Sequence, residues 1–260
     1  MYGSGVLLGI MAMPLLLQLM HSLGQPLDFM RGASLAAALL GVALLLRLRQ
    51  VVQATTVATA GAGRLSRAQR ILCTVLIALI LLRLGTLALE LLWRPLYPWD
   101  ATMHWATKAR VWFEYRSMLP FVPHPVWLEM GGEGVFTDRH PHYPAMIPLL
   151  QVWMNLALGE WNTSLMNLPW LLCLLGLGLA FYGQLRLAGA TVVNATAFSY
   201  LLLSMPLINS HVALAGYADL FLGAAYCGAL MALHNWMRRR EAWLAVLALL
   251  FAALCPLIKN

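Results

Sequence analysis

Long apolar runs separated by short polar segments are the main pattern of this sequence. Most runs approach the roughly 17–25 residues that a helix needs to cross a bilayer, and the second is short. The pattern therefore predicts an all-α, polytopic transmembrane protein of about seven spans. The runs cover residues 1–20, 33–46, 71–93, 165–183, 192–208, 220–236 and 242–258.

Arginines between the runs predict an orientation. One cluster lies between the second and third runs, and "MRRRE" at residues 237–241 separates the last two. Positively charged loops face the cytoplasm, so residues 94–164 should face outward. The apolar segment 144–159 would put the two clusters on opposite sides if it crossed. We therefore expect it to lie in or dip into the outer leaflet.

This topology divides the chain into three parts. Residues 1–52 should form two N-terminal transmembrane helices, and residues 53–70 an Arg-rich cytoplasmic loop. Residues 71–260 should form a membrane module with the outward loop 94–164 and its juxtamembrane helices.

Composition supports the membrane assignment. The chain is 61% hydrophobic and 10% charged, whereas globular domains carry about 25% charged residues. The net charge of +7 comes largely from arginines between apolar runs, so it indicates orientation and not a nucleic-acid partner. The four cysteines are isolated in apolar runs, which favours neither a disulfide framework nor a zinc site.

Polar residues concentrate in "YPWDATMHWATKARVWFEY", residues 97–115. The pattern predicts a helix over about 100–117, lying at the membrane surface with its Trp rings at headgroup level. At 100° per residue, four polar side chains share one face. They are Asp100, His104, Lys108 and Glu114.

Each of these residues also has a structural interpretation. Asp100 is a good helix N-cap, Lys108 a partner for lipid phosphate, and His104 a polar packing residue. "DRHPHYP", residues 138–144, holds His140 and His142, whose spacing alone is a weak metal signal.

Two further groups of charged residues follow from the predicted topology. The segment "HVALAGYAD", residues 211–219, lies on the same side as the long loop, so Asp219 is either a helix cap or a functional carboxylate. Within the third run, Arg83 and Glu90 share a face, and we expect them to pair structurally.

Four segments in order resemble the GT-C superfamily of polytopic glycosyltransferases, which includes bacterial protein O-mannosyltransferases and lipid A aminoarabinose transferases. They are "WDATMHWATKARVWF", "HPHYPAMIPLLQVWMNLALGEWN", "GYADLFLGAAY" and "PLIKN". The resemblance covers about residues 90–260 and implies that the chain is the N-terminal portion of a longer enzyme of the bacterial inner membrane, active at its periplasmic face.

The resemblance implies roles for individual residues. Asp100 and Asp219 match the two acidic residues of the outward loops and are the candidate catalytic groups, with a divalent metal ion between them as a candidate cofactor. Lys259 and His140 match basic elements of the family. The candidate donor-phosphate ligands are Lys108, Arg139, His140 and Lys259, and the accessory polar residues are His104, His142 and Glu114.

The implied reaction moves a sugar from a polyprenyl-phosphate donor to a lipid, glycan or protein acceptor, with inversion. Membrane lipids are the other expected partners. Two other classes stay open: a transporter or lipid-glycan flippase, in which Arg83, Glu90 and Asp219 would line a passage, and a non-catalytic membrane scaffold. A transporter should place essential charges near the midplane, whereas the densest polar cluster here is in an outward loop.

Overall fold

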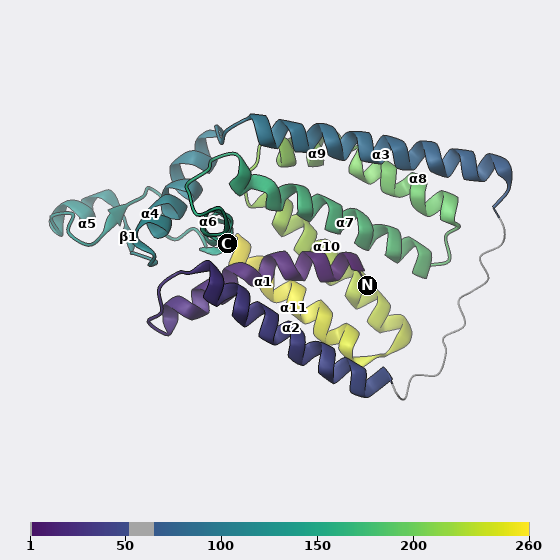
Figure 1. Cartoon of the computed structure of the whole chain (residues 1–260), viewed down its shortest axis with the longest axis horizontal. Coiled ribbons are helices and arrows are strands. Elements are labelled where there is room, and N and C mark those ends of the chain that lie inside the picture. The colour runs from purple at the N-terminus through teal and green to yellow at the C-terminus, as the bar shows by residue number, and fades with distance from the viewer. Residues whose placement is uncertain (1, 52–64, 260) are drawn as a thin grey trace.

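The computed structural model describes residues 2–51 and 65–259 and consists mainly of long helices that run between two ends (Figure 1). We call the end that carries residues 94–164 the polar end and the other the opposite end. The helices between them are α1 (Tyr2–Ser22), α2 (Phe29–Val51), α3 (Arg67–Trp93), α7 (Leu168–Leu187), α8 (Val192–Leu203), α9 (Pro206–Ala213), α10 (Asp219–Arg239) and α11 (Ala242–Ile258).

The helical architecture with apolar, membrane-length helices is confirmed, but seven spans are not. Among the described residues, four helices are long and apolar enough to cross a membrane, namely α1, α3, α10 and the stretch Leu165–Leu187. A fifth span results if α8 and α9 form one unit, which is bent by 54° where Pro206 interrupts the backbone hydrogen bonds. The apolar part of α2 and the whole of α11 are shorter, and 17 residues of helix extend only about 25 Å.

The segment 144–159 forms a short helix at the polar end. This helix, α6 (Met146–Leu158), has 13 residues and is not among the candidate spans. Figure 1 shows α6 nearly end-on, whereas α3 and α7 run lengthwise across the picture. The helix packs on α1 and on α4 (Thr107–Tyr115), which supports the prediction that this segment does not cross.

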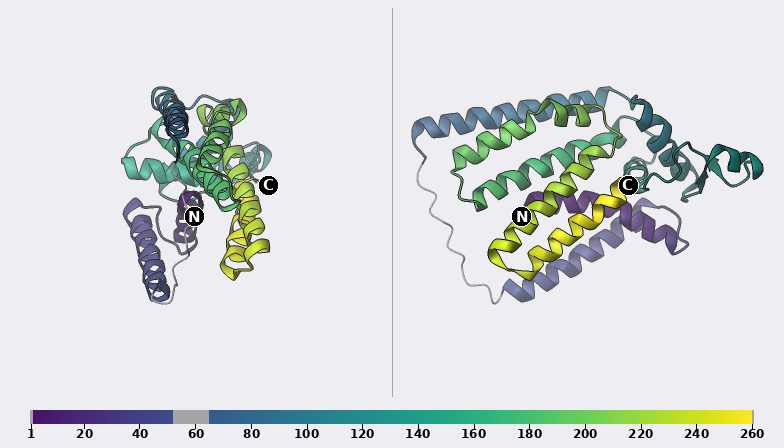
Figure 2. Two further views of the ribbon diagram at one scale, coloured as in Figure 1. Left: turned by 90° about the vertical axis from the view of Figure 1, so that its right-hand side faces the viewer. Right: turned by 180° about the vertical axis from the view of Figure 1, so that it is seen from behind.

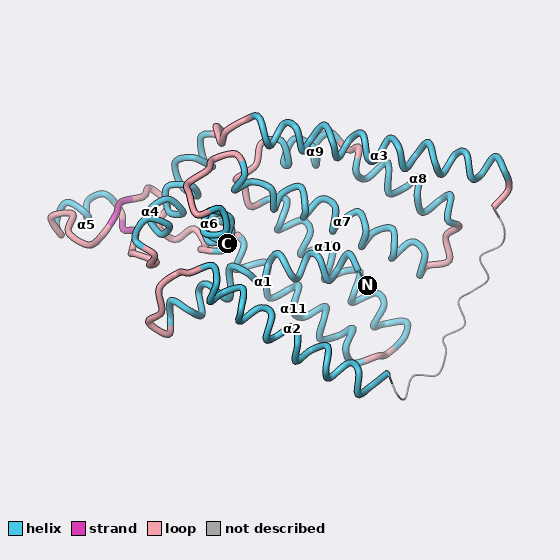
Figure 3. Tube along the Cα trace, in the orientation of Figure 1, coloured by secondary structure: helices cyan, strands magenta, loops and turns pink. Residues whose placement is uncertain are grey.

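The polar end contains the remaining elements. Before α4 lies the π-helix η1 (Ala101–Ala106), and a short 3-10 helix η2 (Leu165–Asn167) precedes α7. The strands β1 (Phe121–Val122) and β2 (Phe136–Thr137) pair in parallel on either side of α5 (His124–Glu129). Figure 2 shows this part protruding beyond the long helices, and Figure 3 shows its two short strands in magenta.

Two apolar clusters form the core. The larger one joins α1, α7, α10 and α11 around Trp170, Phe221 and Phe251, and the smaller one lies beneath the polar end around Trp112. Small residues allow α1 and α7 to touch along their backbones. A Cβ atom on Gly3 would lie 2.1 Å from the backbone nitrogen of Ala180.

Two predictions about the third run need correction. Glu90 pairs with Arg94 at 2.7 Å and not with Arg83, because a partner one helical turn away is closer than one two turns away. Arg83 is exposed on α3. The predicted loop 53–70 also ends too late, since α3 already begins at Arg67. Most of the rest of that loop lies outside the described residues.

Candidate functional site

The predicted helix over 100–117 is present, but its first part is wound as a π-helix. The π turn covers Ala101–Ala106 and is followed by α4, which ends where Arg116 adopts a left-handed conformation. Thr107 Oγ1 donates to the carbonyl of Thr102, five residues earlier, at 2.9 Å. The wider turn changes the helical phase, so the residues predicted to share one face do not all do so.

His104 and Lys108 point together into the polar end and meet Asp138. The Nδ1 atom of His104 lies 2.5 Å from one carboxylate oxygen of Asp138, and Lys108 Nζ lies 3.0 Å from the other. The backbone N–H of His140 donates to the same carboxylate at 3.0 Å. We call His104, Lys108 and Asp138 the buried triad.

The carboxylate of the buried triad is ionised in spite of its burial. Burial opposes ionisation of Asp138, but the His140 N–H, His104 and Lys108 outweigh it and hold the pKa of Asp138 below its ordinary value. Burial lowers the pKa of Lys108, although Asp138 opposes that shift. The carboxylate thus fastens the 138–140 loop to the helical segment.

Lys108 is therefore a structural residue in this arrangement. Its side chain is 1% exposed, and Nζ also donates to the carbonyls of His140 at 2.8 Å and Pro141 at 3.3 Å. With the Asp138 ion pair, these two bonds hold the ammonium inside the fold, so it does not face the surface where the donor phosphate that we expected it to bind would lie. His104 is also buried, and its ring lies against those of His140 and Tyr143.

Asp100 has a different environment. It precedes the π turn and is exposed, its side chain makes no capping hydrogen bond, and no described residue pairs with it. Asp100 thus holds the N-cap position of η1, but its side chain does not satisfy a backbone N–H there.

The loop that carries Asp219 packs directly against the start of this helical segment. Gly216 has φ +102°, and a Cβ there would lie 2.6 Å from the Cβ of Ala101. Only a glycine lets the two loops approach so closely.

Tyr217 is near enough to both carboxylates to be affected by their charges. Burial raises its pKa, and the negative charges of Asp100 and Asp219 raise it further. Tyr217 therefore keeps its hydroxyl proton near neutral pH and can donate a hydrogen bond. Trp170 holds the loop in place by donating from Nε1 to the Tyr217 carbonyl at 3.0 Å.

Asp219 begins α10 and pairs with Lys259, which follows α11. Their atoms are 2.7 Å apart, and the side chains are 37% and 44% exposed. An exposed pair of this kind contributes little to stability and can exchange partners. Asp219 does not cap α10, since it lies in the first turn and Ala218 is the capping residue.

An apolar groove opens beside Asp219. It has a volume of about 450 Å³ and lies between α7, α8, α9 and α10. Its walls are mostly aliphatic, with one Phe ring. The titratable side chains among its lining residues are Asp219, His211 and Cys227. We call this cavity the lateral groove. Its residues are Leu177, Phe181, Leu202, Leu207, Ile208, His211, Asp219, Leu220, Gly223, Ala224, Cys227, Leu230 and Met231.

The described residues fit a divalent metal poorly. No group of three or more His, Cys, Asp or Glu side chains converges in the described part of the chain. Asp100 and Asp219 offer only two carboxylates, and Lys259 already neutralises the second.

The other predicted residues lie on the surface. Arg139, His140 and His142 are exposed, and the His140 ring stacks on Tyr143 with centroids 4.8 Å apart. Glu114 pairs with Arg110 at 2.5 Å on the outside of α4, away from the buried triad that its predicted neighbours form.

Asp138, Tyr143 and Tyr217 were missed by the sequence reasoning. A signal for Asp138 was present: a His and a Lys four residues apart on a helix face need a carboxylate if that face is buried, and "DRHPHYP" contains one. Nothing in the sequence pattern points to Tyr217, because its importance depends on two loops meeting.

Comparisons with protein-family models, with curated proteins and with solved structures find no match for this chain. The assignment of function therefore depends on the site itself.

Proposed function

We propose that this protein is a membrane glycosyltransferase of the GT-C type that uses a polyprenyl-phosphate sugar. The observation that carries the proposal is the meeting of three features at the polar end: the unpaired Asp100, the adjacent Asp219, and the lateral groove that ends at Asp219. An apolar groove with charged groups at one end suits a lipid with a polar head.

In the proposed arrangement the polyprenyl chain lies in the lateral groove and its phosphate lies at the polar end. Lys259 and Arg139 are the exposed cations that would meet the phosphate. Lys259 can do so by exchanging Asp219 for the phosphate oxygens, since the pair is partly exposed. Charge-assisted bonds from these groups would stabilise the departing phosphate.

Asp100 is the proposed general base. Its carboxylate takes the proton of an acceptor hydroxyl while the hydroxyl oxygen bonds to the anomeric carbon. The bond from that carbon to the phosphate oxygen breaks, and the polyprenyl phosphate leaves with the electron pair. Attack opposite the leaving group inverts the anomeric centre. The Tyr217 hydroxyl, which feels the charges of both Asp100 and Asp219, would hold a sugar hydroxyl.

The proposed topology keeps seven crossings, with α8 and α9 counted as one and with α2 and α11 crossing as shorter helices. It places the polar end on the periplasmic side of a bacterial inner membrane. The transporter alternative is less well supported, because Asp219 lines the lateral groove and neither Arg83 nor Glu90 does.

The test is transfer of radiolabelled sugar from a panel of polyprenyl-phosphate sugars in membranes that contain the chain. Asp100→Asn should lower turnover at least about a hundredfold, the scale of general-base catalysis. Glu114→Gln is the matched control, because Glu114 is an exposed carboxylate of the same helical segment and pairs only with Arg110. Equal activity in Asp100→Asn and the control would remove Asp100 from the role of base.

A further inference from the structure

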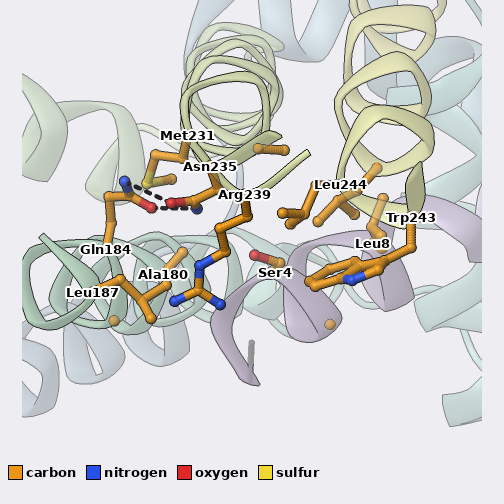
Figure 4. A pocket seen from close by; sticks show the side chains of 14 residues that line it. Ser4, Leu8, Ala180, Gln184, Leu187, Met231, Asn235, Arg239, Trp243 and Leu244 are labelled. Atoms are coloured by element: carbon orange, nitrogen blue, oxygen red, sulfur yellow. Dashed lines mark hydrogen bonds between the residues drawn. The ribbon is translucent and has the colours of Figure 1, made fainter. Parts of the chain in front are cut away.

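A second pocket lies at the opposite end, far from the candidate active site, and is independent of the proposed transferase. It has a volume of about 290 Å³. Side chains from α1, α7, α10 and α11 line it (Figure 4).

The pocket has an amide wall. Asn235 Nδ2 donates to Gln184 Oε1 at 2.7 Å, and Gln184 Nε2 donates to Asn235 Oδ1 at 3.3 Å. The dashed lines in Figure 4 mark this pair, which joins α10 to α7. Each amide group has two N–H donors and uses one of them here, so two donors remain for a bound group.

Arg239 extends toward the same space. Figure 4 shows its guanidinium between the amide wall and Ser4. No acidic residue is among the pocket's lining residues, and no described carboxylate pairs with Arg239. The nearby Glu241 instead accepts a hydrogen bond from Trp243 Nε1 at 2.5 Å. The pocket therefore carries a positive charge without a counterion.

Two arginines near this pocket, Arg186 and Arg240, are engaged elsewhere. Arg186 donates to the Ala190 carbonyl at 2.6 Å, and the Arg240 guanidinium lies over the Trp236 ring at 5.4 Å. Positive charge in cytoplasmic loops would by itself explain arginines at this end. It does not explain why one of them is directed into a pocket between helices.

The rest of the pocket is apolar. Leu8, Met231, Leu244 and Leu247 line it, and Trp243 lines it too. A free hydrated anion would leave these side chains facing water, whereas an acyl chain would cover them. Charged donors beside an apolar wall match an amphiphile with an anionic head.

We infer that this pocket binds an anionic phospholipid. The phosphate diester accepts hydrogen bonds from the Arg239 fork and from the amide wall, and an acyl chain lies along Leu8 and Leu247. A planar guanidinium can hold two phosphate oxygens at once, which an ammonium cannot. The bound lipid thus fills the space between α1, α7 and α10.

The test uses the full chain purified in a non-ionic detergent and titrated with phosphatidylglycerol, with phosphatidylcholine as the neutral comparison. Native mass spectrometry counts the lipids bound. Arg239→Gln should weaken phosphatidylglycerol binding at least about tenfold, the scale of a lost hydrogen bond to a charged group. Arg240→Gln removes the same charge next to it and should weaken binding about fivefold at most, through diffuse electrostatics alone.

A second pair of variants changes no charge. Gly5 lines the pocket, and a Cβ added there meets nothing within 4 Å. Gly5→Phe should therefore fill the pocket without displacing α1 and should abolish specific lipid binding. Gly9→Phe is the matched control, since Gly9 lies on the same helix with equally open space and does not line the pocket.

Three results would overturn the inference. Equal losses of phosphatidylglycerol affinity in Arg239→Gln and Arg240→Gln would show that binding depends on surface charge and not on the pocket. Unchanged binding in Gly5→Phe would place the lipid elsewhere. Occupancy of the pocket by millimolar inorganic phosphate, with no preference for phosphatidylglycerol over phosphatidylcholine, would identify a free-phosphate site.

Discussion

At the scale of single residues, Asp138 joins the separate segments of the polar end. Its carboxylate receives bonds from a π-helical residue, from a residue of α4 and from the backbone of its own loop. Removing one partner of a buried ion pair is costly because the other charge stays buried.

Lys108→Met should accordingly destabilise the fold by about 3 kcal/mol, since it leaves the Asp138 carboxylate without its cation. Adding Asp138→Asn should recover part of this loss, because the amide can still bond to His104 and to the His140 N–H while carrying no charge. Thermal unfolding in detergent, followed by Trp fluorescence, measures both variants. Additive losses in the double variant would contradict the coupling.

The buried triad also predicts a pH dependence. The folded-state pKa of Asp138 is below its usual value of 3.8, so the folded state binds this proton less readily than the unfolded state does. The stabilisation is fully present above the unfolded pKa of about 4 and is lost as the pH falls through the folded pKa. Thermal unfolding between about pH 3 and 6 should show this loss in the wild-type chain, and Asp138→Asn should lack it.

At the scale of secondary-structure elements, helix α10 links the lateral groove to the candidate active site. It begins at Asp219 and carries Gly223 into the groove one turn later. A Cβ on Gly223 meets nothing within 4 Å, so a larger side chain there occupies the groove without straining the helix.

Gly223→Leu should therefore raise the KM for a polyprenyl-phosphate donor several-fold and leave the protein folded, because leucine favours a helix more than glycine does. Gly85→Leu is the control, since Gly85 lies in α3 with equally open space outside the groove. The KM of each variant is measured in transfer assays with donors of different polyprenyl chain length. Only Gly223→Leu should show a raised KM. An identical KM in both variants would show that the donor tail lies elsewhere.

The whole molecule is a bundle with two chemically different ends. Most carboxylates and histidines belong to segments of the polar end, and Arg239 with its neighbours lies at the other. If the bundle crosses a membrane, these ends face different compartments.

Cysteine labelling checks this arrangement. In a chain whose native cysteines are replaced by serine, Glu133→Cys should react with a membrane-impermeant maleimide in intact cells. Arg240→Cys and Ser66→Cys should react only after permeabilisation, because arginine-rich segments stay in the cytoplasm. Labelling of Glu133→Cys and Arg240→Cys from the same side would refute the proposed topology.

The sequence by itself determined the membrane class, the helical architecture and the location of the polar chemistry. These depend on local composition and on periodicity, which are properties of consecutive residues. The helix at 100–117 and the short helix at 144–159 could be predicted for the same reason. The number of spans could not, because it depends on where α2, α9 and α11 end or bend relative to a bilayer.

Only the tertiary structure decided which polar residues are free to react. Lys108 and His104 face Asp138, some thirty residues away in the chain, and so leave the surface, whereas Asp100 remains exposed beside Asp219. The packing of Gly216 against Ala101 brings the segments that carry those two carboxylates together. Such contacts between distant segments depend on loop closure and side-chain packing, and the π turn shifts the helical phase that a regular helix would have, so no local pattern encodes them.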